Sequence, residues 1–152
     1  MTEDVRDSLL LIRAQYIKDQ SFENPNAPDV FSMMKEKSPK IEINVDVSPQ
    51  LISERTYEVT LTLRADAKVE QTSAFVAELA YAGLVSLGEN LTESQVQTAL
   101  LVETPRHLFP FARAILANVT RDGGFPPLVV NPIDFRQMLE KRADQSSESQ
   151  VA

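Results

Sequence analysis

The stretch HLFPFARAILANVTRDGGFPPLVVNPIDF runs from His107 to Phe135 and joins two helical segments through an extended one. Its first part places apolar residues on one stripe of a helix, at Leu108, Phe111, Ala112, Ile115, Leu116 and Val119. Gly123-Gly124 predicts the end of that helix, and Phe125-Pro126-Pro127 is expected to be extended because proline cannot continue a helix. Asn131-Pro132 then predicts the cap and the first position of a last helix.

The residues before this stretch extend the helical region toward the N-terminus. Thr92 and Gln95 have the spacing of a capping box, which predicts that a helix starts there. Thr104-Pro105 predicts a restart, since proline is favoured at the first helical position. Pro110 lies inside the following helix and is expected to kink it. The second half of the chain is therefore predicted to form a long kinked helix and a short C-terminal helix.

Apolar and polar residues alternate through the first half of the chain, which is typical of half-buried strands. The pattern predicts four strands, over Leu9–Phe22, Ile41–Val47, Thr56–Ala65 and Ser73–Leu87, with a turn opening at Ser48-Pro49-Gln50. The fourth strand is apolar on both faces, so we expect it to be buried on both sides or to pair with another subunit. The sequence thus predicts an α+β fold, in which a four-stranded antiparallel sheet packs against the helices.

A long segment, residues 24–39, separates the first two predicted strands. Asn24-Pro25-Asn26-Ala27-Pro28 favours turns, and we expect little regular structure in the segment. It also carries Phe31, Met33 and Met34. Flexible apolar surface that contains methionine suits an adaptable binding site, although the same side chains would also fit beneath the core.

The totals of the chain exclude several classes of protein. Its 152 residues, 43% of them hydrophobic, suit a single domain, predicted over 1–142, with a polar, disordered tail over 143–152. The formal net charge of −7 argues against a nucleic-acid binder and suits a partner with a basic surface. The sequence has no cysteine, no apolar run long enough to span a membrane and no signal-peptide pattern at its start.

No group of residues has the pattern of a catalytic or metal site. His107 is the single histidine, and without cysteine it cannot build a zinc site of the usual kind. The sequence contains neither a glycine-rich phosphate loop nor a G-x-S-x-G motif. Asp19 and Glu23 would need an apolar pocket for acid–base chemistry, so a partner-facing acidic patch is the better interpretation. We therefore predict no enzymatic activity, no cofactor and no metal.

Several motifs resemble those of the SecB family of export chaperones. Leu108–Arg113 reads LFPFAR where that family has LFPYAR, and residues 121–135 resemble its RxGxFPxLxLxPxxF-type run. YIKDQSFENPNAP, from Tyr16 to Pro28, is similar to the family's YxKDxSFExPNAP motif. Tyr57–Val59 and Phe75–Glu78 are similar to its third and fourth strands. Together the matches span roughly residues 10–140.

The resemblance implies an assembly and a function. The assembly would be a homotetramer, a dimer of dimers, with helices packed between two sheets. The function would be that of an ATP-independent cytoplasmic holdase, which binds unfolded precursor proteins and delivers them to the translocase motor SecA. Such a protein needs no nucleic-acid partner, and it contacts the membrane only through SecA. Many weak apolar contacts along one unfolded chain would hold the client without any chemistry.

The resemblance also assigns residues to a SecA-binding site. Asp19, Glu23, Val76 and Glu78 match family positions that bind SecA, with Val76 as the apolar member. The alternative is that the three carboxylates are ordinary charges on a strand surface.

A second set of residues matches the family's client groove. Its members are Phe31, Met33, Met34, Phe111 and Phe135. Plain core packing fits the helical spacing of Phe111 and Phe135 equally well. The family often has a tryptophan after the loop that lines this groove, whereas this chain has no tryptophan.

Three rival functions stay open at this point. The chain would also suit a SecB-like chaperone devoted to one client, such as an antitoxin. A hydrophobic cavity in an α+β domain would equally suit a small molecule or a lipid. An enzyme is the third, although no catalytic pattern favours it.

Overall fold

The computed structural model describes residues 10–151, and the side chains of residues 10–145. Its elements, in chain order, are β1 (Leu10–Glu23), α1 (Asp29–Met33), β2 (Lys40–Ser53), β3 (Thr56–Val69), β4 (Thr72–Leu87), α2 (Glu93–Thr98), η1 (Ala99–Glu103), α3 (Thr104–Asp122) and α4 (Phe135–Val151). None of the described helices is long and apolar enough to cross a membrane.

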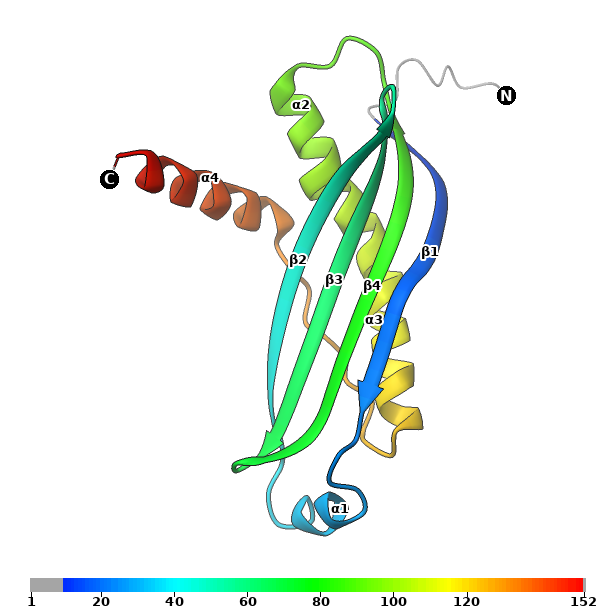
Figure 1. Cartoon of the computed structure of the whole chain (residues 1–152), viewed down its shortest axis with the longest axis vertical. Coiled ribbons are helices and arrows are strands. Elements are labelled where there is room, and N and C mark those ends of the chain that lie inside the picture. Colours follow the sequence, from blue (N-terminus) through cyan, green and yellow to red (C-terminus); the bar gives the residue numbers. More distant parts are fainter. Residues whose placement is uncertain (1–9, 152) are drawn as a thin grey trace.

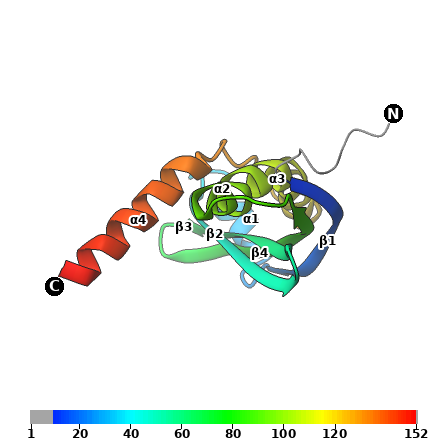
Figure 2. The same ribbon diagram turned by 90° about the horizontal axis from the view of Figure 1, so that it is seen from above.

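The four strands form one antiparallel sheet in the order β1-β4-β3-β2. The helical segment α2–η1–α3 lies along one face of this sheet, and none of the described helices covers the other face (Figures 1 and 2). The side chains between sheet and helix form the core, with Leu61, Leu79 and Leu108 almost completely buried. The predicted α+β fold with a four-stranded antiparallel sheet, a long helix and a C-terminal helix is confirmed.

The central position of β4 explains why its sequence is apolar on both sides. It pairs with β1 along one edge and with β3 along the other. On the helix side, Ala77, Leu79 and Tyr81 are buried. On the opposite side, Ala82 is 0% exposed because the side chains of the flanking strands cover it.

The predicted turn at Ser48-Pro49-Gln50 is wrong. Strand β2 continues through these residues to Ser53, and Pro49 lies opposite Val59 of β3. Because β2 is the edge strand of the sheet, a proline is tolerated there without loss of a ladder hydrogen bond. The chain turns instead after Ser53, where Arg55 has a φ of 55°.

The segment between β1 and β2 is more regular than predicted. It contains the short helix α1, in which Val30 is 0% exposed and donates its N–H to the carbonyl of Asn26. The ring of Phe31 packs on Phe125, with the ring centroids 5.2 Å apart. The burial of Val30 and the partial burial of Phe31 explain why a proline-rich segment adopts a helical turn.

The predicted helix restart at Thr104-Pro105 is a π-helical turn inside one continuous helical segment. The capping box is confirmed, since Thr92 and Gln95 exchange both hydrogen bonds. Pro105 has no N–H to offer the carbonyl one turn earlier, and the turn before it widens. The backbone N–H and the hydroxyl of Thr104 both donate to the carbonyl of Ala99. Helix α3 then continues through the exposed Pro110.

The structure defines where α3 ends and where α4 begins. Helix α3 ends at Asp122, and Gly124 has a φ of 95°, which confirms the Gly-Gly stop. The predicted cap at Asn131-Pro132 is wrong, because Asp134 caps α4 by accepting the N–H of Gln137 at 3.0 Å.

Residues 143–151 of the predicted polar tail belong to helix α4. Helix α4 continues to Val151, and residue 152 lies outside the described residues. The tail contains neither proline nor glycine, so nothing in its composition stops a helix that has already begun.

Candidate functional site: an acidic sheet face and an apolar groove

The four SecA-binding candidates lie on the sheet face that carries no helix. In the β1–β4 register, Glu23 lies opposite Val76, Ser21 opposite Glu78, and Asp19 opposite Ala80. Opposed residues of an antiparallel pair point to the same face. Their neighbours Phe22, Ala77 and Leu79 point to the helix side. The register therefore brings Asp19, Glu23, Val76 and Glu78 together on one surface, called the acidic face below.

Two irregularities in β1, between Ile12 and Ala14 and between Ile17 and Asp19, decide which of its side chains reach this face. Ile17 lies opposite Tyr81, on the helix side, whereas Asp19 lies opposite Ala80, on the bare side. Regular alternation would have put residues 17 and 19 on the same side. The extra residue in β1 is Lys18, and it reverses the alternation.

The carboxylates of the acidic face differ in whether they have an ion-pair partner. Within the described part of the chain, Asp19 and Glu23 are exposed and make no ion pair. Glu78 accepts a hydrogen bond from Arg64, with 2.9 Å between Nη1 and Oε2. The second terminal nitrogen of Arg64, Nη2, lies 3.9 Å from Asp66 Oδ2. The acidic face thus has two free carboxylates and one that is paired within the chain.

A second polar cluster lies further along the same face. The hydroxyl of Tyr16 donates to Glu58 Oε2 at 2.6 Å, and Lys18 forms an ion pair with the same carboxylate. Burial and the neighbouring Glu58 raise the pKa of Tyr16 to about 12. The hydrogen bonds from Lys18 and Tyr16 hold the pKa of Glu58 below its usual value. At neutral pH, Glu58 is therefore ionised and already partnered.

On the helix side of the sheet, two predicted segments meet and enclose an apolar groove. Met34, Ser38, Pro39 and Ile41 form one wall, and Phe125–Val129 form the other. Phe75 of β4 contributes from the sheet, with its ring centroid 4.9 Å from that of Phe125. The groove encloses about 290 Å³. The methionine-bearing segment and the proline-bound segment, predicted separately, are thus the two walls of one groove.

The predicted groove residues do not all lie at this groove. Met34 lines it, and Phe31 supports its wall through Phe125. Met33 packs partly buried against the core. Phe111 is 53% exposed on α3 and stacks on Tyr81, with the ring centroids 6.3 Å apart.

Phe135 has a different environment again. It is 2% exposed, and its ring lies edge-on to that of Phe109. Its position fits the core-packing alternative. Sequence reasoning did not select Phe75, Phe125 or Val129 as groove residues, although the two prolines after Phe125 marked the extended wall.

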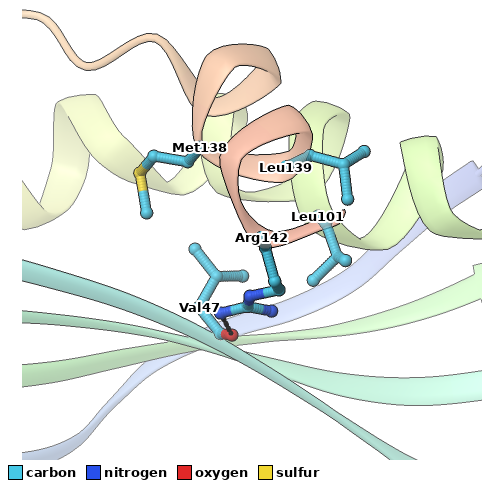
Figure 3. A pocket seen from close by; sticks show the side chains of 5 residues that line it. All are labelled: Val47, Leu101, Met138, Leu139 and Arg142. Atoms are coloured by element: carbon cyan, nitrogen blue, oxygen red, sulfur yellow. Dashed lines mark hydrogen bonds between the residues drawn. The ribbon is translucent and has the colours of Figure 1, made fainter. Parts of the chain in front are cut away.

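Helix α4 is seated against the edge strand β2 and the segment η1. The seat is a small cleft of about 20 Å³ (Figure 3), lined by Val47, Leu101, Met138, Leu139 and Arg142. The guanidinium of Arg142 donates to the carbonyl of Val47 at 3.3 Å, an acceptor that no neighbouring strand uses at the sheet edge. The remainder of α4 projects away from the sheet (Figures 1 and 2).

Among the described residues, no three His, Cys, Asp or Glu side chains gather in a way that would hold a metal ion. The geometry consists of an apolar groove on one side of the sheet and an acidic face on the other. The family model described as preprotein translocase subunit SecB matches residues 3–146. The chain belongs to the SecB family. Membership of this family makes it a chaperone of protein export.

Relatives named protein-export protein SecB agree with this assignment. The chain is 47% identical to that of Paramagnetospirillum magneticum over 141 residues, which cover 93% of this chain and 90% of the relative. It is 46% identical to that of Rhodospirillum rubrum over 143 residues, covering 94% and 87%. It is 42% identical to that of Anaplasma phagocytophilum over 151 residues, covering 91% and 96%.

A solved structure supports the fold. The chain is similar to the SecB-like chaperone of Mycobacterium tuberculosis in complex with a peptide from the HigA1 antitoxin, with a TM-score of 0.65. The match covers 82% of this chain and 87% of that chain, at 13% sequence identity.

Proposed function

We propose that this SecB-family protein is an ATP-independent holdase, which binds unfolded precursor proteins in the cytoplasm and delivers them to SecA. The observation that carries the proposal is the apolar groove of about 290 Å³, walled by a methionine-bearing segment and a proline-bound extended segment. An unfolded chain exposes apolar side chains that a folded protein hides, and such a groove buries them.

The two walls of the groove suit clients of many sequences. Met34 is unbranched and adapts to differently shaped side chains. Pro126 and Pro127 fix the opposite wall in an extended form without N–H groups that would need partners. Each contact contributes roughly 25 cal/mol per Å² of buried apolar surface, so affinity grows with the length of client that is bound. Several grooves acting on one client would add by avidity.

The proposed assembly is a homotetramer, built as a dimer of dimers. Strand β1 is an edge of the described sheet, so that its backbone is paired with β4 on one side and has no strand partner on the other, and its Leu11 and Ile17 are 39% and 47% exposed. An exposed edge of this length is a site for pairing with another chain. Phe111 of α3 stays 53% exposed beside Tyr81, and it is a large apolar side chain that a second layer would cover.

The acidic face is the proposed docking site for SecA. Asp19, Glu23 and Glu78 would contact a basic surface, and Val76 would supply an apolar contact among them. This site requires no movement of the groove walls, because it lies on the other side of the sheet.

The test measures assembly, client holding and docking separately. Native mass spectrometry should give a tetramer, and the protein should delay refolding of several unrelated unfolded precursors without nucleotide. A monomer that leaves refolding unchanged would refute the holdase. Delay of one client alone would instead favour a dedicated chaperone. Changing Asp19, Glu23 and Glu78 to Lys should abolish SecA binding while client holding persists.

A further inference from the structure

Arg64 is the one cation that contacts a docking carboxylate among the described residues. It lies directly opposite Glu78 in the β3–β4 register, and its guanidinium is 2.9 Å from that carboxylate. Both side chains are partly exposed, Arg64 at 45% and Glu78 at 40%. Their pair is therefore open to an approaching partner.

The two other docking carboxylates have no such partner in the part of the chain that the structure describes. Asp19 and Glu23 lie on β1, separated from β3 by the whole width of β4. On its β2 side, Arg64 lies opposite Asn44, which is uncharged. Of the three docking carboxylates, Arg64 therefore acts on Glu78, and it places a positive charge beside that carboxylate.

We propose that Arg64 competes internally with the basic partner for Glu78, and that it thereby sets how tightly the acidic face binds. The proposal rests on the docking function proposed above. A cation of the partner that approaches Glu78 must displace the guanidinium or share the carboxylate with it. In either case, the like charge of Arg64 repels the arriving cation. Arg64 is an affinity-determining residue rather than a docking contact.

Asp66 makes the displacement of Arg64 physically easy. It lies two residues along β3 on the same face, and its Oδ2 is already 3.9 Å from Nη2 of Arg64. When a partner takes Glu78, the guanidinium keeps a carboxylate neighbour and is not left unpaired. The pair Glu78–Asp66 therefore offers Arg64 two resting positions, one with the docking carboxylate masked and one with it open.

The experiment is SecA binding to the intact protein, measured by calorimetry at low and at physiological salt, for Arg64→Gln and Arg64→Lys. Arg64→Gln should bind about two- to fivefold more tightly, which is the range expected from an exposed ion pair. Arg64→Lys keeps the charge and should stay close to the unchanged protein. The matched control is Arg55→Gln, which removes a cation from an exposed pair with Glu89 at the other end of the sheet. It changes the net charge equally and should not alter the affinity.

A double variant separates this inference from the docking proposal. In a Glu78→Gln background, which should itself weaken binding, Arg64→Gln should tighten binding less than in the unchanged protein, because the competition for Glu78 is gone and only the repulsion by Arg64 is left to remove. If Glu78→Gln weakens binding but Arg64→Gln has no effect, or no more effect than Arg55→Gln, the role of Arg64 is refuted and docking stands. If Glu78→Gln leaves SecA affinity unchanged, both proposals fail. Circular dichroism and native mass spectrometry of each variant verify that fold and assembly are retained.

Discussion

A charge placed on the exposed wall of the groove should separate client binding from stability. Val129 lines the groove and is 54% exposed, so about half of its surface is available for a client to bury. Complete burial of such a side chain contributes roughly 2 kcal/mol, so Val129→Asp removes about 1 kcal/mol per groove. That loss weakens binding about fivefold for each groove that a client occupies, before any cost of desolvating the carboxylate.

Stability should hardly change in this variant. The side chain is already half in water, and surface substitutions of this kind stay within about 0.5 kcal/mol. The matched control is Ile52→Asp at the end of β2, where an apolar side chain with the same 54% exposure lies outside the groove. It introduces the same charge at a comparable exposure.

The assay is fluorescence anisotropy with a labelled unfolded precursor, alongside thermal unfolding of each variant. Val129→Asp should lose about fivefold in affinity for a short client that occupies one groove, and more for a long client that reaches several. Ile52→Asp should bind as the unchanged protein does. Equal affinities for the two variants would refute the assignment of the client to this groove.

Three further predictions concern the acidic face, the tyrosine cluster and the end of α3. Neutralising Asp19 and Glu23 together, to Asn and Gln, should weaken SecA binding and flatten its dependence on salt, as titrations at two ionic strengths will show. Because the pKa of Tyr16 is raised to about 12 in the folded protein, its contribution to stability is complete below pH 10 and is lost between about pH 10 and 12. Urea unfolding across that range should show a steeper decline than in Tyr16→Phe, and parallel curves would contradict the cluster. Gly124→Ala should destabilise the fold by more than about 1 kcal/mol, since φ is 95° there and a Cβ would meet the Phe31 ring at 2.9 Å, whereas an unchanged denaturation midpoint would rule out that strain.

The sequence predicts the sheet well because its signals are local. Alternation along Thr56–Ala65 requires one buried face, and Val59, Leu61 and Leu63 are 0% exposed as a result. The capping box at Thr92 and the glycine stop are equally local and are confirmed. Prediction from local sequence fails where the position of a residue in the folded sheet decides its conformation. Pro49 marks a turn in most contexts, but on an edge strand it has no partner to lose.

The candidate site depends on features that a pattern of residue types does not contain. The two bulges of β1 each reverse its alternation, so that residues 14 to 17 face the sides opposite to those that the pattern predicts, whereas Asp19 returns to the predicted side. The groove arises because residues 34–41 and 125–129 lie side by side on the helix side of the sheet, although they are far apart in the sequence. Spacing on α3 predicted Phe111 and Leu108 on one stripe, yet Phe111 is 53% exposed and Leu108 is 0% exposed. The stripe is narrower than the spacing allows, because only one flank of α3 contacts the sheet.

Strand β4 links the two proposed surfaces and separates them. Phe75 points into the groove, while Val76, the next residue, points to the acidic face between Glu23 and Asp66. A client and SecA would therefore contact opposite sides of the same strand without sharing a side chain. Client release cannot then result from direct competition at this sheet. If SecA docks as proposed, release has to follow from contacts that SecA makes to the client itself or to the walls of the groove.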